Sequence, residues 1–384
     1  PMIKRSLFVF LICAFAITCF AQDDWKIHQP TLTPQNSGTT QLLIAVSPVD
    51  SRVVWAAGTG GTYVVTTDGG KHWKSGIVPG AESLQFRDVQ GVSDQIAYLM
   101  SIGNNTTDFR IYKTEDGGAH WKIQFTNELA NAFYDCFAFW TPDRGIAHSD
   151  SVDGVFPDIR TTDGKSWESI APNMPPALSG EASFSSSGTC ITTEGSENAW
   201  ITTGGSTISR ILATRDGGDT WNAYETPLVS SPSAGGLSVA FRDPWNGIVG
   251  GGDLSTNASA DAATSNDGGQ TWTLTKKPPV EGAIFCLAYA RGMRLGDGRD
   301  ADGDDDTYYR DADDRDHHHE LDRTVVITAE TQPNFDSGSA AWTPDEGHTW
   351  FKLPNVSGYW AVAFANPHAG WFVGNGGEIL KISF

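Results

Sequence analysis

The sequence predicts an all-β fold, a β-propeller of seven four-stranded antiparallel blades closed into a ring. One short turn motif recurs at a period near 50 residues, strand-like runs fill the intervals, and the two ends of the chain carry complementary parts of one further repeat. A fixed period of this length is typical of repeated small units that bury their apolar faces against their neighbours. A single propeller domain over residues 22–384 is therefore expected, although the length alone would allow two or three domains.

The N-terminal residues resemble an export signal. Lys4 and Arg5 precede an apolar run at residues 7–20, which is the order of charge and hydrophobicity in a signal peptide. The run is short for a membrane span, and no second long apolar run follows it. We therefore predict a signal peptide at residues 1–21, a secreted or periplasmic protein, and no membrane span. Lipid anchoring at Cys19 is the alternative.

The net charge of the chain limits the classes of partner that it is expected to bind. It carries 46 acidic and 26 basic residues, a formal net charge of −20. Proteins that bind nucleic acid without regard to sequence neutralise phosphates with Lys and Arg, so a nucleic acid is not an expected partner. Anionic lipid surfaces are disfavoured for the same reason.

Three cysteines follow the predicted signal, Cys136, Cys190 and Cys286, and each stands among apolar or small residues. An odd number without a close pair argues against a disulfide framework, even in an exported protein. We therefore expect three buried free thiols. The chain has no Cys-x-x-Cys pair of the kind that binds zinc.

The recurring motif is Thr or Ser, any residue, Asp, any residue, Gly, two residues and Trp. Five copies are complete and one is a residue short, and successive aspartates are separated by 48, 47, 53, 51 and 78 positions. The aspartates and tryptophans of the six copies are Asp68 and Trp73, Asp116 and Trp121, Asp163 and Trp167, Asp216 and Trp221, Asp267 and Trp272, and Asp345 and Trp350.

The composition of the motif suits a tight hairpin. Asp, Ser and Thr side chains bond backbone groups two to four residues away, and glycine supplies the positive φ that such a turn requires. The tryptophan begins the next strand and is expected to pack between sheets. We interpret all twelve motif residues as structural. In the first repeat the runs LLIAVSP, VVWAAG, TYVVTT and WKSGIV give four strands, as expected for one blade.

The motif is identified as the Asp box of BNR-repeat propellers. The fuller pattern of apolar strand, Gly-rich turn, strand and Thr-x-Asp-Gly-Gly-x-x-Trp resembles the photosystem II stability/assembly factor-like group of WD40/YVTN/BNR-like proteins, over essentially the whole chain after residue 21. The resemblance implies a propeller that binds protein. It does not assign a photosynthetic role, because Asp boxes occur on propellers with many functions.

The ends of the chain predict how the ring closes. Three strand-like runs follow Trp350 without a further Asp box, whereas the segment from Asp23 to Lys26 resembles the residues that follow a box. Pairing the N-terminal strand with the C-terminal strands completes a seventh blade and removes exposed sheet edges.

One segment, residues 296–322, departs from the repeat and accounts for the longest step between boxes. It contains 12 acidic residues and three arginines, a composition that cannot bury enough apolar surface to offset its ordering entropy. Aspartates alternate from Asp300 to Asp304 as in a calcium loop, but Asp305 stands where that loop requires glycine. We predict a disordered acidic insertion without a specific metal. Weak divalent binding, at the aspartates or at the histidines 317–319, and a sequence artefact are the alternatives.

No catalytic constellation is evident in the sequence. The nucleophile-elbow, P-loop, zinc-protease and dinucleotide motifs are absent, and so is the Arg-Ile-Pro motif of the sialidases, which also carry Asp boxes. Neither a cofactor nor a metal is expected. We predict a non-catalytic, monomeric propeller that binds a protein or peptide. A glycoside hydrolase or other carbohydrate-active propeller that uses the mouth of the central channel is the alternative.

Polar residues within the apolar inner strands, or at their ends, are the candidate binding residues at the channel mouth. The alternative for each is that it satisfies backbone groups in a turn. The six candidates are Arg87, Asp135, His148, Asp150, Asp153 and Asp253.

Overall fold

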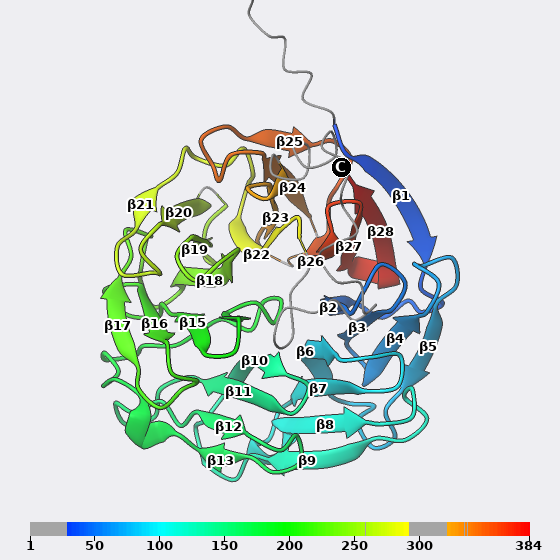
Figure 1. Ribbon diagram of the computed structural model, residues 1–384, viewed down its shortest axis with the longest axis horizontal. Coiled ribbons are helices and arrows are strands. Elements are labelled where there is room, and N and C mark those ends of the chain that lie inside the picture. Colours follow the sequence, from blue (N-terminus) through cyan, green and yellow to red (C-terminus); the bar gives the residue numbers. More distant parts are fainter. Residues whose placement is uncertain (1–28, 258, 292–320, 334, 336) are drawn as a thin grey trace, which may run out of the picture.

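The computed structural model describes residues 29–257, 259–291, 321–333, 335 and 337–384. These residues form seven four-stranded sheets arranged as a ring around a central channel (Figure 1). All pairs of adjacent strands within the first blade are antiparallel, and the other blades repeat this pattern. The predicted seven-bladed propeller is confirmed. The predicted signal peptide and residues 296–320 of the acidic segment lie outside the described residues, so both stay predictions.

Strands follow one another outward from the channel in each blade. Blade 1 consists of β2 (Leu43–Pro48), β3 (Val54–Gly58), β4 (Thr62–Thr66) and β5 (Lys74–Ile77), and blade 2 of β6 (Gln85–Gly91), β7 (Ala97–Ile102), β8 (Arg110–Thr114) and β9 (Lys122–Thr126). Blade 3 consists of β10 (Tyr134–Thr141), β11 (Arg144–Ser149), β12 (Ile159–Thr161) and β13 (Glu168–Ser169), and blade 4 of β14 (Ile191–Glu194), β15 (Asn198–Thr202), β16 (Arg210–Thr214) and β17 (Asn222–Glu225). Blade 5 consists of β18 (Ala234–Phe241), β19 (Gly247–Asp253), β20 (Asp261–Ser265) and β21 (Thr273–Leu274), and blade 6 of β22 (Ala283–Tyr289), β23 (Val325–Glu330), β24 (Gly338–Thr343) and β25 (Phe351–Leu353). Blade 7 consists of β26 (Tyr359–Asn366), β27 (Ala369–Gly374), β28 (Glu378–Ser383) and β1 (Thr31–Asn36).

Three single turns of 3₁₀-helix lie within the described residues. They are η1 (Thr106–Asp108), η2 (Ala171–Asn173) and η3 (Asn375–Gly377). In this part of the chain, no helix is long and apolar enough to cross a membrane.

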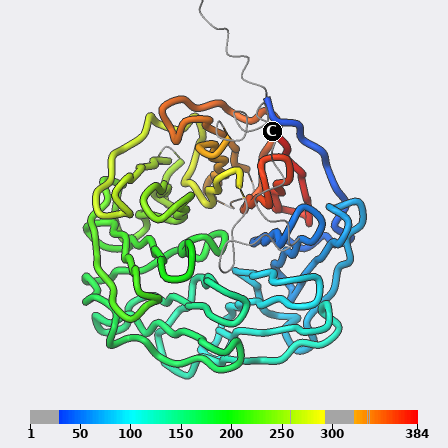
Figure 2. The backbone as a smooth tube through the Cα atoms, viewed as in Figure 1, coloured from blue at the N-terminus to red at the C-terminus, as the bar shows by residue number. Residues whose placement is uncertain are grey.

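The seventh blade closes the ring with strands from both ends of the chain. Strand β1 pairs antiparallel with β28 from Thr31 opposite Ser383 to Asn36 opposite Glu378. In Figure 2 the blue and red ends of the described chain meet in this blade. Closure is confirmed, but the closing strand begins at Thr31, beyond the Asp23 to Lys26 segment that the sequence analysis assigned to it.

The Asp-box hairpins join the third and fourth strand of blades 1 to 6. In blade 1 the Thr66 hydroxyl donates to Asp68 Oδ1 at 2.9 Å and accepts the Gly70 N–H at 3.0 Å, and Asp68 Oδ1 also accepts the His72 N–H at 2.9 Å. The motif therefore closes its own turn, as its composition predicts. In the shortened copy Asp163 accepts amides one residue earlier, from Lys165 and Ser166.

Aromatic side chains fill the space between neighbouring blades. Trp121, from the Asp box of blade 2, lies with its ring centroid 5.3 Å from that of Tyr63 and 6.3 Å from that of Trp55, both in blade 1. Trp221 is 7% exposed, in a core cluster that blades 3 and 4 build together. The prediction that motif tryptophans pack between sheets is confirmed at these two positions.

The cysteines differ from the sequence prediction. Cys136 on β10 and Cys190, just before β14, form a disulfide between blades 3 and 4, although 54 positions separate them. The expectation of three free thiols was wrong because it considered spacing along the chain. Equivalent positions on neighbouring inner strands are adjacent in space, since they are one blade apart. Cys286 is a buried free thiol, as predicted.

The two faces of the ring carry different loops, because successive strands run in opposite directions. We call the upper face the one that carries the loops between blades, such as residues 127–133, and the loops between the second and third strand, such as residues 150–158. The lower face carries the Asp-box hairpins.

Candidate functional site: the mouth of the central channel

Six of the seven inner strands carry a β-bulge near their first residues, at equivalent positions along the channel. In each, the register of pairing with the second strand shifts across one residue. A bulge of this kind leaves its extra residue outside the ladder and re-aims the side chain. The six bulge residues, one per blade, are Ile44, Arg87, Asp135, Leu237, Phe285 and Trp360.

The bulge residues converge on the channel. Ile44, Leu237, Phe285 and Trp360 come from four different blades and belong to one buried cluster. The rings of Phe285 and Trp360 are 5.2 Å apart, edge to face. The Arg87 guanidinium lies 5.5 Å from the centroid of the Trp360 ring, so blade 2 reaches across to blade 7. Blades 5, 6, 7 and 1 thus line the mouth with apolar side chains, and blades 2 and 3 line it with charges.

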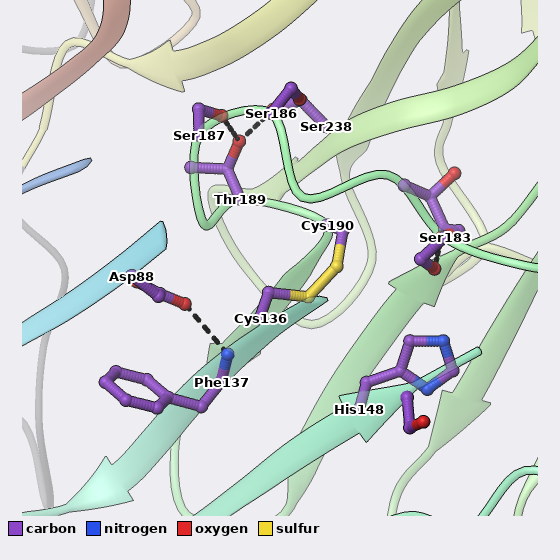
Figure 3. The surroundings of a disulfide bond; sticks show 12 residues. Asp88, Cys136, Phe137, His148, Ser183, Ser186, Ser187, Thr189, Cys190 and Ser238 are labelled. Atoms are coloured by element: carbon purple, nitrogen blue, oxygen red, sulfur yellow. Dashed lines mark hydrogen bonds between the residues drawn. A yellow bond between two sulfur atoms is a disulfide. The ribbon is translucent and has the colours of Figure 1, made fainter. Parts of the chain in front are cut away.

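Blade 4 differs from the others. Its inner strand β14 has four residues and a regular register, whereas the other inner strands have six to eight. In place of the missing half strand, residues 183–190 enter the channel, and we call them the channel segment. Figure 3 shows this loop leading from Ser183 past Ser187 and Thr189 to Cys190, where the disulfide joins it to β10.

The channel segment bonds to the next two blades of the ring. The hydroxyls of Ser186 and Ser187 donate to the carbonyl oxygen of Phe285 in blade 6, at 3.0 and 2.7 Å. The Thr189 hydroxyl is 2.7 Å from that of Ser238 in blade 5. The bonds to Phe285 reach beyond the adjacent blade 5, so the segment extends into the mouth of the channel.

Blade 2 contacts the same segment from its own side. Arg87 Nη1 donates to the Ser185 carbonyl at 3.1 Å, and Nη2 donates to Gln85 at 2.9 Å. Burial lowers the pKa of Arg87 to about 10, and the nearby charge of Asp135 partly opposes this. The arginine therefore holds the segment from a site that water hardly reaches.

Asp135 and Asp150 form a coupled pair of acids. Burial raises the pKa of Asp135 well above its ordinary value, and the neighbouring Asp150 raises it further. Burial also raises the pKa of Asp150, although the Ser183 N–H, 2.9 Å from its Oδ1, partly offsets this. Two neighbouring carboxyls in a buried site do not both ionise readily.

His148 lies in the interior of blade 3, away from the channel opening. Its side chain is fully buried, and Nδ1 is 2.9 Å from Oδ2 of Asp158, which is also fully buried. Asp158 accepts the Ser149 N–H as well, at 3.0 Å. The ring of Phe156 packs 5.3 Å away. Asp158 therefore fixes the His148 ring and the Ser149 amide within the blade.

The two remaining candidates lie in upper-face turns. Asp153 is exposed, with a φ of 52°, in the tight turn between Val152 and Val155. Asp253 Oδ1 accepts the hydroxyl of Ser233 and both the amide and hydroxyl of Ser255. Bonds to Ser255, the hydroxyl first, lower the pKa of Asp253. Asp253 therefore satisfies groups of its local turn, the alternative that the sequence left open, and Asp153 lies within a turn.

The structure therefore brings three of the six candidates together at the mouth: Arg87, Asp135 and Asp150. The sequence analysis missed the apolar members of the mouth and the channel segment. Apolar bulge residues such as Trp360 look like ordinary core residues in the sequence. The segment had a signal, since the step from Asp163 to Asp216 is 53 residues, five longer than the first step.

The ionisable side chains of the site are poorly accessible to a substrate. Asp135 is 1% exposed and His148 is fully buried, so neither reaches a substrate in solution. Within the described ranges, no three His, Cys, Asp or Glu side chains are grouped so as to hold a metal ion.

Solved structures share this architecture. The structure of YCF48 bound to D1 peptide has a TM-score of 0.59 and 15% sequence identity, and the alignment covers 92% of this chain and 97% of that one. YCF48 from Cyanidioschyzon merolae gives 0.57 at 15% identity, covering 92% and 98%. A GH74 xyloglucanase from Xanthomonas campestris gives 0.57 at 12% identity, covering 91% of this chain and 53% of the enzyme. No protein-family model and no curated protein matches the sequence. The likeness shows the propeller fold, which this chain shares with YCF48.

Proposed function

We propose that this chain is an exported, non-catalytic propeller that binds a protein or peptide segment on its upper face. The observation that carries the proposal is the placement of exposed apolar side chains. Leu129 and Val155 are each 47% exposed and Val229 is 43% exposed, and all three lie on upper-face loops. Three of the seven large apolar side chains exposed in the described residues therefore lie on this face, where they offer apolar contacts to a docking segment.

The net charge favours a cationic partner. With 46 acidic and 26 basic residues, the chain attracts positively charged segments over a long range. The fold also has a precedent for peptide binding, because YCF48 has been solved with a bound D1 peptide. We therefore expect a segment that combines basic and apolar side chains.

A hydrolase is the competing function, and one observation favours it. The acid pair at the mouth has raised pKa values, as the acid of a glycosidase must, and the GH74 neighbour is a xyloglucanase. However, the channel segment covers the pair, and Asp135 is 1% exposed. Peptide binding therefore fits the accessible surface better.

The test is an array of 15-residue peptides probed with the folded protein, followed by affinity measurement on the best binder. Val155→Asp should weaken that affinity tenfold or more. The matched control is Ile77→Asp, since Ile77 is 56% exposed on the outermost strand of blade 1 and should leave affinity unchanged. Absence of any binder, or equal losses for both variants, would contradict the proposal. Release of sugar from xyloglucan, abolished by Asp150→Asn, would establish the hydrolase.

A further inference from the structure

The channel segment is held at both ends. Upstream, the Glu181 carboxylate accepts Arg210 Nε at 2.8 Å, and its carbonyl accepts the Ser151 hydroxyl at 2.6 Å. Downstream, Cys190 is covalently joined to Cys136 of blade 3. The first anchor consists of polar contacts, and the second is a bond that only redox chemistry opens.

Between the two anchors, the segment forms no β-ladder with a neighbouring strand. Its contacts with the other blades are the side-chain hydroxyl bonds to Phe285 and Ser238, the bond from Arg87, the backbone bond from the Val239 N–H to the Thr189 carbonyl at 2.9 Å, and the packing of Phe184 against the apolar bulge residues. Water can replace each of these bonds, so their net contribution to holding the segment is modest. The disulfide adds to these bonds a covalent restraint between the downstream end of the segment and blade 3.

The segment also passes very close to blade 2. A Cβ built on Gly188 would lie 2.5 Å from Asp88 Oδ1. That carboxylate accepts the amides of Val89 and Phe137, at 2.7 and 2.8 Å, and Figure 3 shows it bonded to Phe137 beside the disulfide. The segment thus lies at the mouth in contact with blades 2, 3, 5 and 6.

We propose that the Cys136–Cys190 disulfide is a redox latch: while it is closed the channel segment blocks the mouth, and when it is open the segment leaves and exposes the ring of bulge residues. This inference does not rest on the proposed peptide binding. It concerns the state of the channel itself, whichever ligand the protein takes.

The chemistry of the latch is thiol–disulfide exchange with a dithiol. One thiolate of the dithiol attacks a sulfur of the disulfide and displaces the other cysteine as a thiolate, which takes a proton. The second thiolate of the dithiol then displaces the first cysteine. The protein gains two electrons and two protons, and the dithiol becomes a disulfide. Export would place the chain in an oxidising compartment, where the disulfide stays formed.

The third cysteine, Cys286, is not part of the disulfide, but the accessibility of its thiol can show whether the channel segment has moved. Cys286 Sγ lies 3.3 Å from the Val362 carbonyl, and the Ser187 and Thr189 hydroxyls of the channel segment interact with its thiol. Burial raises the pKa of this thiol, so it is a poor nucleophile in thiol–disulfide exchange. Departure of the segment removes the Ser187 and Thr189 hydroxyls from this thiol and should increase its exposure.

The experiment measures how fast a thiol reagent labels Cys286. It uses the chain without residues 1–21, which carry the other two cysteines. Wild type and the double variant Cys136→Ser, Cys190→Ser then each have Cys286 as their single free thiol. We expect labelling at least tenfold faster in the double variant, with hydrogen exchange increased in residues 183–189 and unchanged in the β15–β16 hairpin.

Two results would overturn the proposal. Equal labelling rates and unchanged exchange would mean that the hydrogen bonds hold the segment without the disulfide. Exchange increased evenly in all blades would mean that the disulfide stabilises the whole ring and has no special effect on the channel. If the double variant does not fold, wild type reduced with dithiothreitol in native buffer gives the same comparison. Exchange in residues 183–189 is then the measurement, and unchanged exchange there refutes the latch.

Discussion

Replacing Trp221 by alanine tests whether the motif tryptophans hold neighbouring blades together. This side chain is 7% exposed in the cluster shared by blades 3 and 4. An aromatic side chain of this size buries about 200 Å², and at about 25 cal/mol per Å² its removal costs about 5 kcal/mol. Its indole Nε1 has no hydrogen-bond partner among the described residues, so no hydrogen bond is lost. Partial collapse of the cavity lowers the cost, and we expect about 4 kcal/mol.

The measurement is the free energy of unfolding from urea denaturation followed by circular dichroism. The matched control is Trp245→Ala, because Trp245 is 55% exposed on a lower-face hairpin and its ring centroid lies 4.9 Å from the Arg215 guanidinium. An exposed cation–π contact contributes about 0.5–1 kcal/mol, so this variant should lose about 1 kcal/mol or less. Equal losses for the two variants, or a loss below about 1 kcal/mol for Trp221→Ala, would refute the reasoning.

Four further perturbations test other parts of the ring. Asp216→Ala removes the acceptor of the Thr214 hydroxyl and of the Thr220 amide and hydroxyl. It should lower the free energy of unfolding by about 1–3 kcal/mol without changing ligand affinity. Gly188→Ala should lower the melting temperature more than Gly154→Ala, since both have a φ near +80° but only the first meets a carboxylate. Burial raises the pKa of Asp261 to about 6, so its contribution to stability is complete below about pH 4 and is lost as the pH rises through 6; Asp261→Asn should therefore melt higher than wild type at pH 7 and equally at pH 4. Deletion of Thr31–Asn36 should lower the melting temperature, because β28 then loses its outer partner.

Much of the fold follows from local chemistry that the sequence displays. The Asp box contains its own hydrogen-bond partners, as Thr66 and Asp68 illustrate, so each copy marks a hairpin wherever it occurs. The place of the closing strand was less predictable. Strand β1 is defined by pairing with β28 and by the bond from Trp73 Nε1 to Gln35 at 3.1 Å, which are contacts between distant parts of the chain.

The site was predictable only where it carries charge. Arg87 and Asp135 were identified because charged residues are unusual in inner strands. The disulfide partner of Cys136 depends on which inner strands are neighbours and at what height their residues stand. The path of residues 183–190 depends on space left by other blades, which no local pattern records.

The pairing of β1 with β28 has a consequence for the order in which the molecule can be made. Thr31 meets Ser383, so the first strand of the propeller to be synthesised has its partner in the last strand of the propeller. Blades 1 to 6 each complete as soon as their own residues emerge, because their strands are consecutive. The ring cannot close until β28 has emerged, and until then the sheet of blade 7 lacks its outer half. Contacts of such long range slow folding, which under the proposed export leaves time for an incomplete chain to be threaded through a membrane before it becomes a closed, rigid body.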